Sequence, residues 1–176
     1  MTVHATTAPA QRQPVDDPDL TQHRRQPHDL TAEQAVLGAM MLSKDACAEV
    51  FTILRGEDFY RPVHRMIFDA MLRLYSQGEP VDPIVVATAL DEAGNLVKVG
   101  GAPYLHTLVA AVPPAVNATY YARTVADRAV ERRLIEAGAR IMQLGYRGAD
   151  ATGRSTAELA TLAQQAIFEV TTRDAV

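Results

Sequence analysis

The sequence HRMIF at residues 64–68, followed by GEPVD at residues 78–82, decides the fold of this chain. Pro62 stands just before the first segment, at a position where a helix can begin, because the N–H that proline lacks is unsatisfied there in any case. Across 63–75 the apolar residues recur at alternating steps of three and one. This spacing gives one apolar stripe of period 3.6 and predicts an amphipathic helix.

The second segment predicts the end of that helix and the start of the next. Gly78 is placed to close the helix in a left-handed conformation. Asp82 can cap the following helix through its carboxylate, and Pro83 fits the first helical position. We therefore expect two consecutive helices that pack on each other.

The same signals predict the other helices of the chain. Thr31-Ala32-Glu33-Gln34 fits a capping box before a helix that ends near Leu42. Another helix is expected from about Asp45 to Leu54. A short helix opens at Gly100-Gly101-Ala102-Pro103 and ends before Pro113-Pro114, because proline disfavours helix in the residue that precedes it.

The last third of the chain predicts an antiparallel helical hairpin. Asn117 caps a long helical pattern from Ala118 to about Leu144, whose length allows a break near 127–132. Residues 145–154 are expected to form a polar turn, and Ser155-Thr156-Ala157-Glu158 is a second capping box. No alternating strand pattern occurs. The predicted fold is all-α, a compact bundle of about six helices followed by the hairpin.

Composition and patterning suggest three parts. Residues 1–27 contain four prolines and few apolar side chains, so we expect a disordered tail that is dispensable for folding. Residues 28–125 are predicted to form a helical globular subdomain, and residues 126–176 the hairpin. Apolar residues make up 48% of the chain, which is enough for a buried core.

Charge and cysteine content limit the classes of function. The formal net charge of −4 argues against nucleic-acid binding as the main role, since such binders carry a basic face. The single Cys47 cannot form an intramolecular disulfide and is expected to be a small buried hydrophobe. The sequence shows neither a secretory signal nor an apolar run of the ~20 residues that a membrane span needs. We therefore expect a cytoplasmic protein with no membrane partner.

One segment nearly matches a phosphate-binding loop. Gly148 to Ser155 follows the pattern GxxxxGK[ST], with Arg154 in place of lysine. Such a loop needs a buried strand before it, whereas residues 140–146 have a helical pattern. We interpret the segment as a hairpin turn and assign no nucleotide, cofactor or metal site.

No constellation of catalytic residues is apparent either. His64 and His106 lack an acidic partner that the sequence identifies, and N-capping explains Asp82 fully. Several arginines follow the long helix, and the acidic residues between them favour a solvated, salt-bridged face over a phosphate track (Arg123, Arg128, Arg132, Arg133, Arg140 and Arg147).

The hairpin is the candidate interaction surface. Its apolar residues recur at steps of four and three, which is a heptad-like seam. Two helices can cover only one side of such a seam, and exposed apolar surface marks an interface. The predicted oligomer-interface residues are Leu134, Ile141, Leu144, Leu159 and Leu162.

Several short motifs, taken in order, resemble the N-terminal domain of DnaB-type replicative DNA helicases. They extend over about residues 27–172, and their order and spacing carry the resemblance. They are Glu33-Gln34-Ala35-Val36-Leu37-Gly38, Asp58-Phe59-Tyr60, the 64–68 run, Pro80-Val81-Asp82, Gly100-Gly101 with Tyr104-Leu105, Asn117 with Tyr121-Ala122, and Arg132-Arg133-Leu134-Ile135.

The resemblance implies an oligomerisation and partner-docking domain of a hexameric helicase that unwinds DNA at the replication fork. The implied partners are other copies of the chain, in dimer pairs that build a hexameric ring, together with primase and a helicase loader. Single-stranded DNA is expected to pass through the full-length ring and not to bind at a dedicated site in this domain. ATP and magnesium are implied for a motor domain outside this sequence, which the hairpin leads toward. This part of the protein is expected to be neither an ATPase nor a cofactor binder.

Two other classes of protein remain open. The first is a freestanding helical adaptor or regulator with the same fold and no motor. The second is a helix-turn-helix DNA binder, which the acidic balance and the lack of a compact basic recognition helix disfavour.

The missing strand before Gly148 predicts that the chain does not bind nucleotide. Calorimetric titration with a non-hydrolysable ATP analogue and Mg²⁺ should show no saturable binding at micromolar concentration. Saturable binding that is lost on Arg154→Ala would contradict the prediction.

Overall fold

The computed structural model describes residues 25–113 and 117–172, apart from the side chains of 149–152. Regular structure in these residues is entirely helical, which confirms the predicted all-α class. The elements are α1 (Leu30–Leu42), α2 (Lys44–Ile53), the short 3₁₀ helix η2 (Gly56–Asp58), α3 (Pro62–Ser76), α4 (Pro83–Glu92), α5 (Gly101–Ala110), α6 (Ala118–Thr152) and α7 (Thr156–Thr172).

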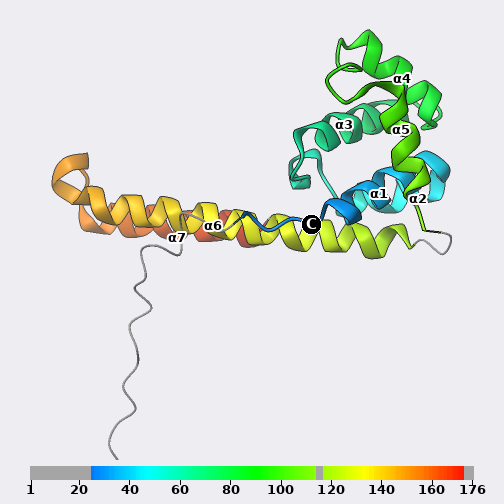
Figure 1. Ribbon diagram of the computed structural model, residues 1–176. Coiled ribbons are helices and arrows are strands. Elements are labelled where there is room, and N and C mark those ends of the chain that lie inside the picture. Colours follow the sequence, from blue (N-terminus) through cyan, green and yellow to red (C-terminus); the bar gives the residue numbers. More distant parts are fainter. Residues whose placement is uncertain (1–24, 114–116, 173–176) are drawn as a thin grey trace, which may run out of the picture.

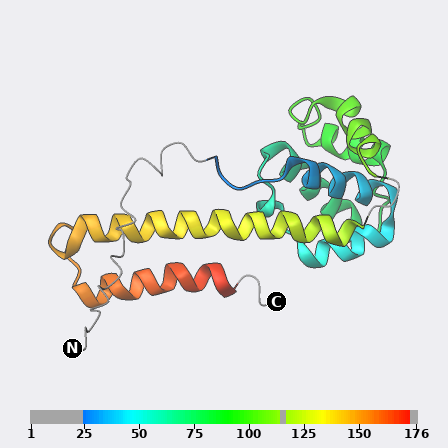
Figure 2. The same ribbon diagram turned by 60° about the horizontal axis from the view of Figure 1, so that its bottom comes forward.

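The helices form a globule and a projecting rod (Figure 1). Helices α1 to α5 gather at one end, and the first part of α6 packs against α1, α2 and η2. The rest of α6 extends beyond the globule, and α7 returns antiparallel beside it (Figure 2). Helix α6 therefore belongs to both the globule and the predicted hairpin.

Helix α1 lies at the centre of the globule and is buried around most of its circumference. Val36, Leu37 and Met40 are at most 1% exposed, and the helix contacts α2, α3, α5 and α6. Gly38 is where α5 comes closest, since a Cβ there would lie 2.2 Å from the carbonyl oxygen of Leu108. The apolar stripe of α3 packs against the same core, as the sequence predicts.

The helix boundaries confirm most of the predicted caps. The Asp82 carboxylate accepts hydrogen bonds from the Ile84 and Val85 N–H groups, and Pro83 is the first residue of α4. Asn117 caps α6 by accepting from the Tyr120 N–H at 3.0 Å. Gly78 has a φ of +78°, which closes α3 in the left-handed conformation.

The cap predicted for the first helix is wrong. Helix α1 begins at Leu30, one residue before the proposed Thr31, and Asp29 is the N-cap that accepts from the Ala32 N–H at 2.9 Å. An aspartate three residues ahead of a free N–H caps it as well as a threonine does. Glu33, the neighbour of the proposed capping-box glutamine, takes part in a different interaction, described below.

The predicted turn over residues 145–154 is also wrong, because α6 continues through most of it to Thr152. The helix has no break near 127–132, and its one described departure from helical geometry is at Gly148 (φ +65°, ψ +175°). The reversal itself is short. It uses Gly153 at φ +64° and a capping box in which Ser155 and Glu158 bond each other's backbone N–H.

A buried polar network ties three helices of the globule together. Glu33 on α1 is 1% exposed, and its Oε2 accepts a hydrogen bond from Nδ1 of the fully buried His64 on α3 at 2.5 Å. His64 Nε2 lies 2.7 Å from the hydroxyl of Tyr104 on α5, which also accepts from Arg61 at 3.2 Å. The other carboxylate oxygen, Oε1, accepts the Tyr60 N–H at 2.7 Å.

This network contradicts the view of His64 as a residue without an acidic partner. The partner lies 31 positions earlier, and no local pattern in the sequence links the two. A buried carboxylate is stable only when its oxygens are hydrogen-bonded, and here both oxygens are. The network therefore fixes the positions of α3 and α5 relative to α1.

Replacing Glu33 by alanine should strongly destabilise the protein. Removing one partner of a buried pair leaves His64 and the Tyr60 N–H unsatisfied, so the free energy of unfolding should fall by about 3–5 kcal/mol. Urea unfolding followed by circular dichroism measures this. The exposed Glu92→Ala control should change it by less than about 0.5 kcal/mol. A loss for Glu33→Ala as small as that of the control would refute the role of the network.

Burial should also protect the single thiol. Cys47 is fully buried, its Sγ contacts the Met40 carbonyl, and burial raises the pKa of the thiol from 9.0 to about 11. At pH 8 the thiolate is then about 100-fold scarcer than in the unfolded chain, so reaction with Ellman's reagent should be at least that much slower than in urea. Equal reaction rates in the native and denatured protein would contradict this prediction.

The raised pKa also means that the thiol's contribution to stability is present below pH 9 and lost as the pH rises toward 11.

Candidate interaction surfaces

The seam of the hairpin is narrow and built from small residues. Ala137 of α6 packs with Ala166 and Val170 of α7, and Val130 and Ile141 cover this cluster. The contact holds α6 and α7 together along the rod but buries little of their larger apolar side chains. Apolar surface is therefore left for another molecule.

The structure divides the five residues predicted for the interface. Ile141, Leu144, Leu159 and Leu162 are half-buried, and Ile141 contacts the seam cluster. Leu134 is 48% exposed and lies outside the cluster. A step of four and three selects one side of a helix, but it does not separate residues that face the partner helix from those beside them.

A second exposed apolar face lies on the side of α6 away from the seam, since Ile135 is two residues from the seam residue Ala137. Ile135 and Met142 are each 51% exposed and Tyr146 is 85% exposed. They are spaced by seven and four residues, so they share one side of α6. Three glycines of α6 have open space where a Cβ would be (Gly138, Gly145 and Gly148). These residues recur at the same heptad-like spacing as the seam residues, so the sequence pattern alone does not distinguish this face from the seam.

The globule and the rod meet at a cluster of arginine contacts. Arg132 is 8% exposed and donates to the carbonyl oxygens of Pro27 at 2.7 Å and Asp58 at 2.5 Å. Its guanidinium lies 5.8 Å from the ring of Tyr60, which stacks on His28 at 4.2 Å. This joint (residues 27–28, 58–60 and 132–133) fixes the direction in which the rod leaves the globule.

The neighbouring arginine strengthens the same joint. Arg133 Nη1 lies 2.7 Å from Oδ1 of the nearly buried Asp58. The other carboxylate oxygen, Oδ2, accepts the Arg55 N–H at 2.8 Å. Arg132 and Arg133 are thus structural, not part of the solvated face expected from the sequence, whereas Arg128 does pair with Glu131 on the surface.

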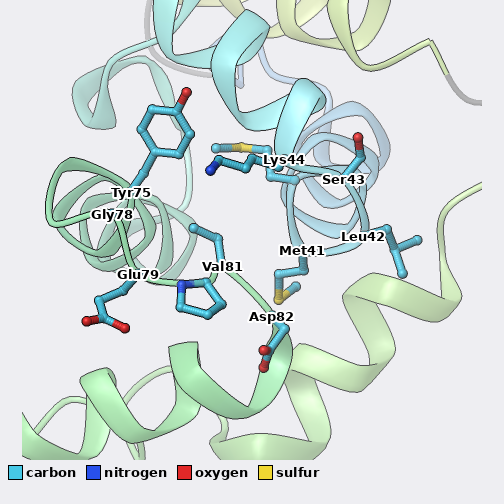
Figure 3. Close-up of a pocket in the computed structure, with 11 residues that line it drawn as sticks. Met41, Leu42, Ser43, Lys44, Tyr75, Gly78, Glu79, Val81 and Asp82 are labelled. Carbon is cyan, nitrogen blue, oxygen red and sulfur yellow. The ribbon is translucent and has the colours of Figure 1, made fainter.

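A hollow of about 550 Å³ lies on the opposite part of the globule (Figure 3). The corner between α1 and α2 forms one wall, with Met41 and Lys44, and the segment from Gly78 to Asp82 forms the other. Met40 and Met41 are buried, while Leu42 is 60% exposed. Leu42 thus gives the hollow an exposed apolar side chain, which makes it a second candidate for protein contact.

The near match to a phosphate-binding loop lies in the wrong structural context for nucleotide. The residues before Gly148 are helical, so no strand presents the loop. Within the described residues, no group of three His, Cys, Asp or Glu side chains could hold a metal ion. Nor does any helix there combine the length and apolar character needed to cross a bilayer.

Comparison with known proteins agrees with this geometry. Residues 25–127 match the family model of the DnaB-like helicase N terminal domain. The replicative DNA helicase DnaB of Mycobacterium leprae is 54% identical over 147 residues, which are 84% of this chain and 24% of that protein. The chain thus spans about a quarter of the length of this curated relative.

Solved structures show the same fold. The N-terminal domain of DnaB helicase from Mycobacterium tuberculosis superposes with a TM-score of 0.77 at 53% identity, covering 82% of this chain and 99% of that one. A DnaB-like replicative helicase, whose structure is described together with its interactions with primase, gives a TM-score of 0.66 at 25% identity over 81% of this chain and 31% of that one. The family model covers more than half of the sequence, and on this ground the chain belongs to the family of DnaB-like helicase N-terminal domains.

Proposed function

We propose that this chain is the oligomerisation and partner-docking domain of a hexameric replicative DNA helicase that acts at the replication fork. The observation that carries the proposal is the exposed apolar face of α6 around Ile135 and Met142. An apolar face of this kind on a protruding rod marks a protein-protein contact. The family membership supports assigning that contact to other copies of the chain.

The chemistry of the helicase then takes place outside this domain. ATP and magnesium act in a motor region outside this sequence, and the domain described here is not an enzyme. Its contribution is to hold subunits together so that single-stranded DNA passes through the assembled ring.

Two further partners belong to the proposal. The primase interactions described for the DnaB-like helicase structure support a primase contact for this domain. The methionine-lined hollow between α1–α2 and Gly78–Asp82 is suited to a second protein, for which we propose a helicase loader. A freestanding adaptor with the same fold is the alternative, and the gene region downstream of this sequence distinguishes the two.

The proposed self-association can be tested without unfolding the domain. Ile135→Glu with Met142→Glu places two charges on an exposed face, so the variant should stay folded and lose its assembly. Light scattering should give a mass near the monomer value of 19.1 kDa for the variant and at least twice that for the unchanged chain. Ile84→Glu with Val97→Glu is the matched control, because both residues are exposed on the globule.

A second double variant tests the half-buried residues of the interface that the sequence predicts. Ile141→Glu with Leu162→Glu should both weaken assembly and lower the thermal midpoint, since Ile141 also covers the hairpin seam. An unchanged mass in both hairpin variants, or a monomeric parent chain at about 100 μM, would contradict the proposed role of the hairpin.

A further inference from the structure

The residues that precede α1 are attached to the rod where it leaves the globule. The Pro27 carbonyl accepts a hydrogen bond from Arg132 of α6 at 2.7 Å. The His28 ring stacks on the ring of Tyr60, with 4.2 Å between their centroids. The chain before Pro27 therefore starts from a fixed point on the side of α6.

Two contacts on successive turns of α6 set the direction of that chain. The pKa of Arg128 is raised by its hydrogen bond and ion pair with Glu131 and, to a smaller extent, by the charge of Asp29, in keeping with Asp29 lying near this turn. Pro27 lies at Arg132, one turn further along the helix. Earlier residues of the chain therefore head toward the tip of the rod. Figures 1 and 2 show the blue segment running from α1 along the rod in this direction.

The exposed apolar face of α6 lies in the path of this segment. Arg128, Ile135 and Met142 are seven residues apart in turn, so they lie in one line along the helix. Tyr146 is four residues beyond Met142 and continues the line. All three apolar side chains of the line are exposed. A chain that continues from Pro27 toward the tip passes over them.

The sequence before the described residues is long enough to reach along the whole face. Tyr146 lies about 21 Å from Arg132 along α6, at 1.5 Å per residue. Seven extended residues span about 23 Å, so Leu20 reaches the level of Tyr146 when the chain is extended from Pro27.

The composition of this stretch also suits an extended cover. Leu20 is the large apolar residue nearest to the described part of the chain, and Val15 is the next. Burying Leu20 against the face removes apolar surface of both from water. Pro14 and Pro18 favour an extended backbone, which lowers the entropy lost when the segment is held along a helix.

The attachment at Pro27 favours the chain's own segment over a segment of another molecule. A segment on a short tether has an effective concentration in about the millimolar range at a nearby surface. A second copy of the chain must therefore supply more apolar contact in order to displace it. A complete helix, such as the α6 of that copy, does so.

We propose that residues 15–24 lie along α6 and cover the apolar face, with Leu20 against Met142 and Tyr146, while the domain is not assembled. The segment is a cover that a second copy displaces, and it limits assembly at low concentration. The competition rests on the self-association proposed above, whereas the position of the segment does not.

The position of the segment is tested with a nitroxide attached to Thr21→Cys in the 1–176 chain. Cys47 is buried and its thiol has a raised pKa, so labelling is confined to position 21. Amide signals of residues 139–147 on α6 should broaden, and those of α4 should not. Adding nitroxide-bearing chain without ¹⁵N to ¹⁵N-labelled chain without nitroxide should give no broadening, because the contact lies within one molecule.

A matched pair of substitutions separates the apolar contact from a change of charge. Leu20→Glu in the labelled chain should abolish the broadening of α6. Thr6→Glu adds the same charge to the segment and removes no large apolar side chain, so it should leave the broadening unchanged. Circular dichroism of each variant should match that of the unchanged chain, since no described residue is altered.

Sedimentation equilibrium of the unlabelled variants tests the competition. If the segment covers the face about four-fifths of the time, its loss raises the fraction of competent chains about fivefold. Leu20→Glu should therefore lower the Kd of self-association at least about fivefold, and Thr6→Glu should change it by less than about twofold.

Three results would overturn the proposal. The first is broadening of α4 equal to that of α6. The second is broadening in the mixed sample as strong as in the labelled chain, which would assign the segment to a second copy. The third is a Kd that Leu20→Glu leaves unchanged. A chain that stays monomeric while α6 broadens would instead contradict the self-association, and with it the competition, and support the position of the segment.

Discussion

The buried carboxylate of Glu33 is the constraint on which the rest of the structure depends. It lies in the most enclosed helix of the globule, where an unpaired charge would be unstable. Its oxygens accept from the His64 ring and from backbone N–H groups at the start of α3. Helix α3 must therefore begin where it does, and Tyr104 brings α5 to the same point through His64. Apolar packing holds the globule together, and the directional hydrogen bonds of the network fix the positions of α3 and α5 relative to α1.

The same region of the chain also sets the direction of the rod. Residues 58–60 lie between the Glu33 network and the arginine joint, since the Tyr60 N–H donates to Glu33 while the Asp58 carbonyl accepts from Arg132. Any change that shifts this loop acts on both the core and the hairpin. The globule and the rod are therefore coupled through three residues as well as through α6.

Local signals in the sequence predicted most of the fold, and contacts between distant residues account for the rest. Proline at a first turn, aspartate or asparagine at a cap and glycine at a helix end act within a few residues, and they placed α3, α4 and the start of α6. The end of α6 was mispredicted because its glycines suggested a turn, whereas packing against α7 maintains the helix through Gly145. The pairing of Glu33 with His64 and of Arg132 with Pro27 spans 31 and 105 positions, which no periodicity encodes. The exposed face of α6 was missed for a related reason. A heptad spacing shows which residues share one side of a helix, but it does not show whether another helix covers that side.

The continuity of α6 has a mechanical consequence. One helix passes without a described break from the globule through the joint and along the rod as far as Arg147. The part beyond Arg133 is about 21 Å long, at 1.5 Å per residue. A rotation of about 10° at the joint therefore displaces the tip by about 4 Å, which is close to the width of a side chain. The rod is a lever arm, and small rearrangements where the residues around His28 and Tyr60 contact Arg132 are magnified at its end.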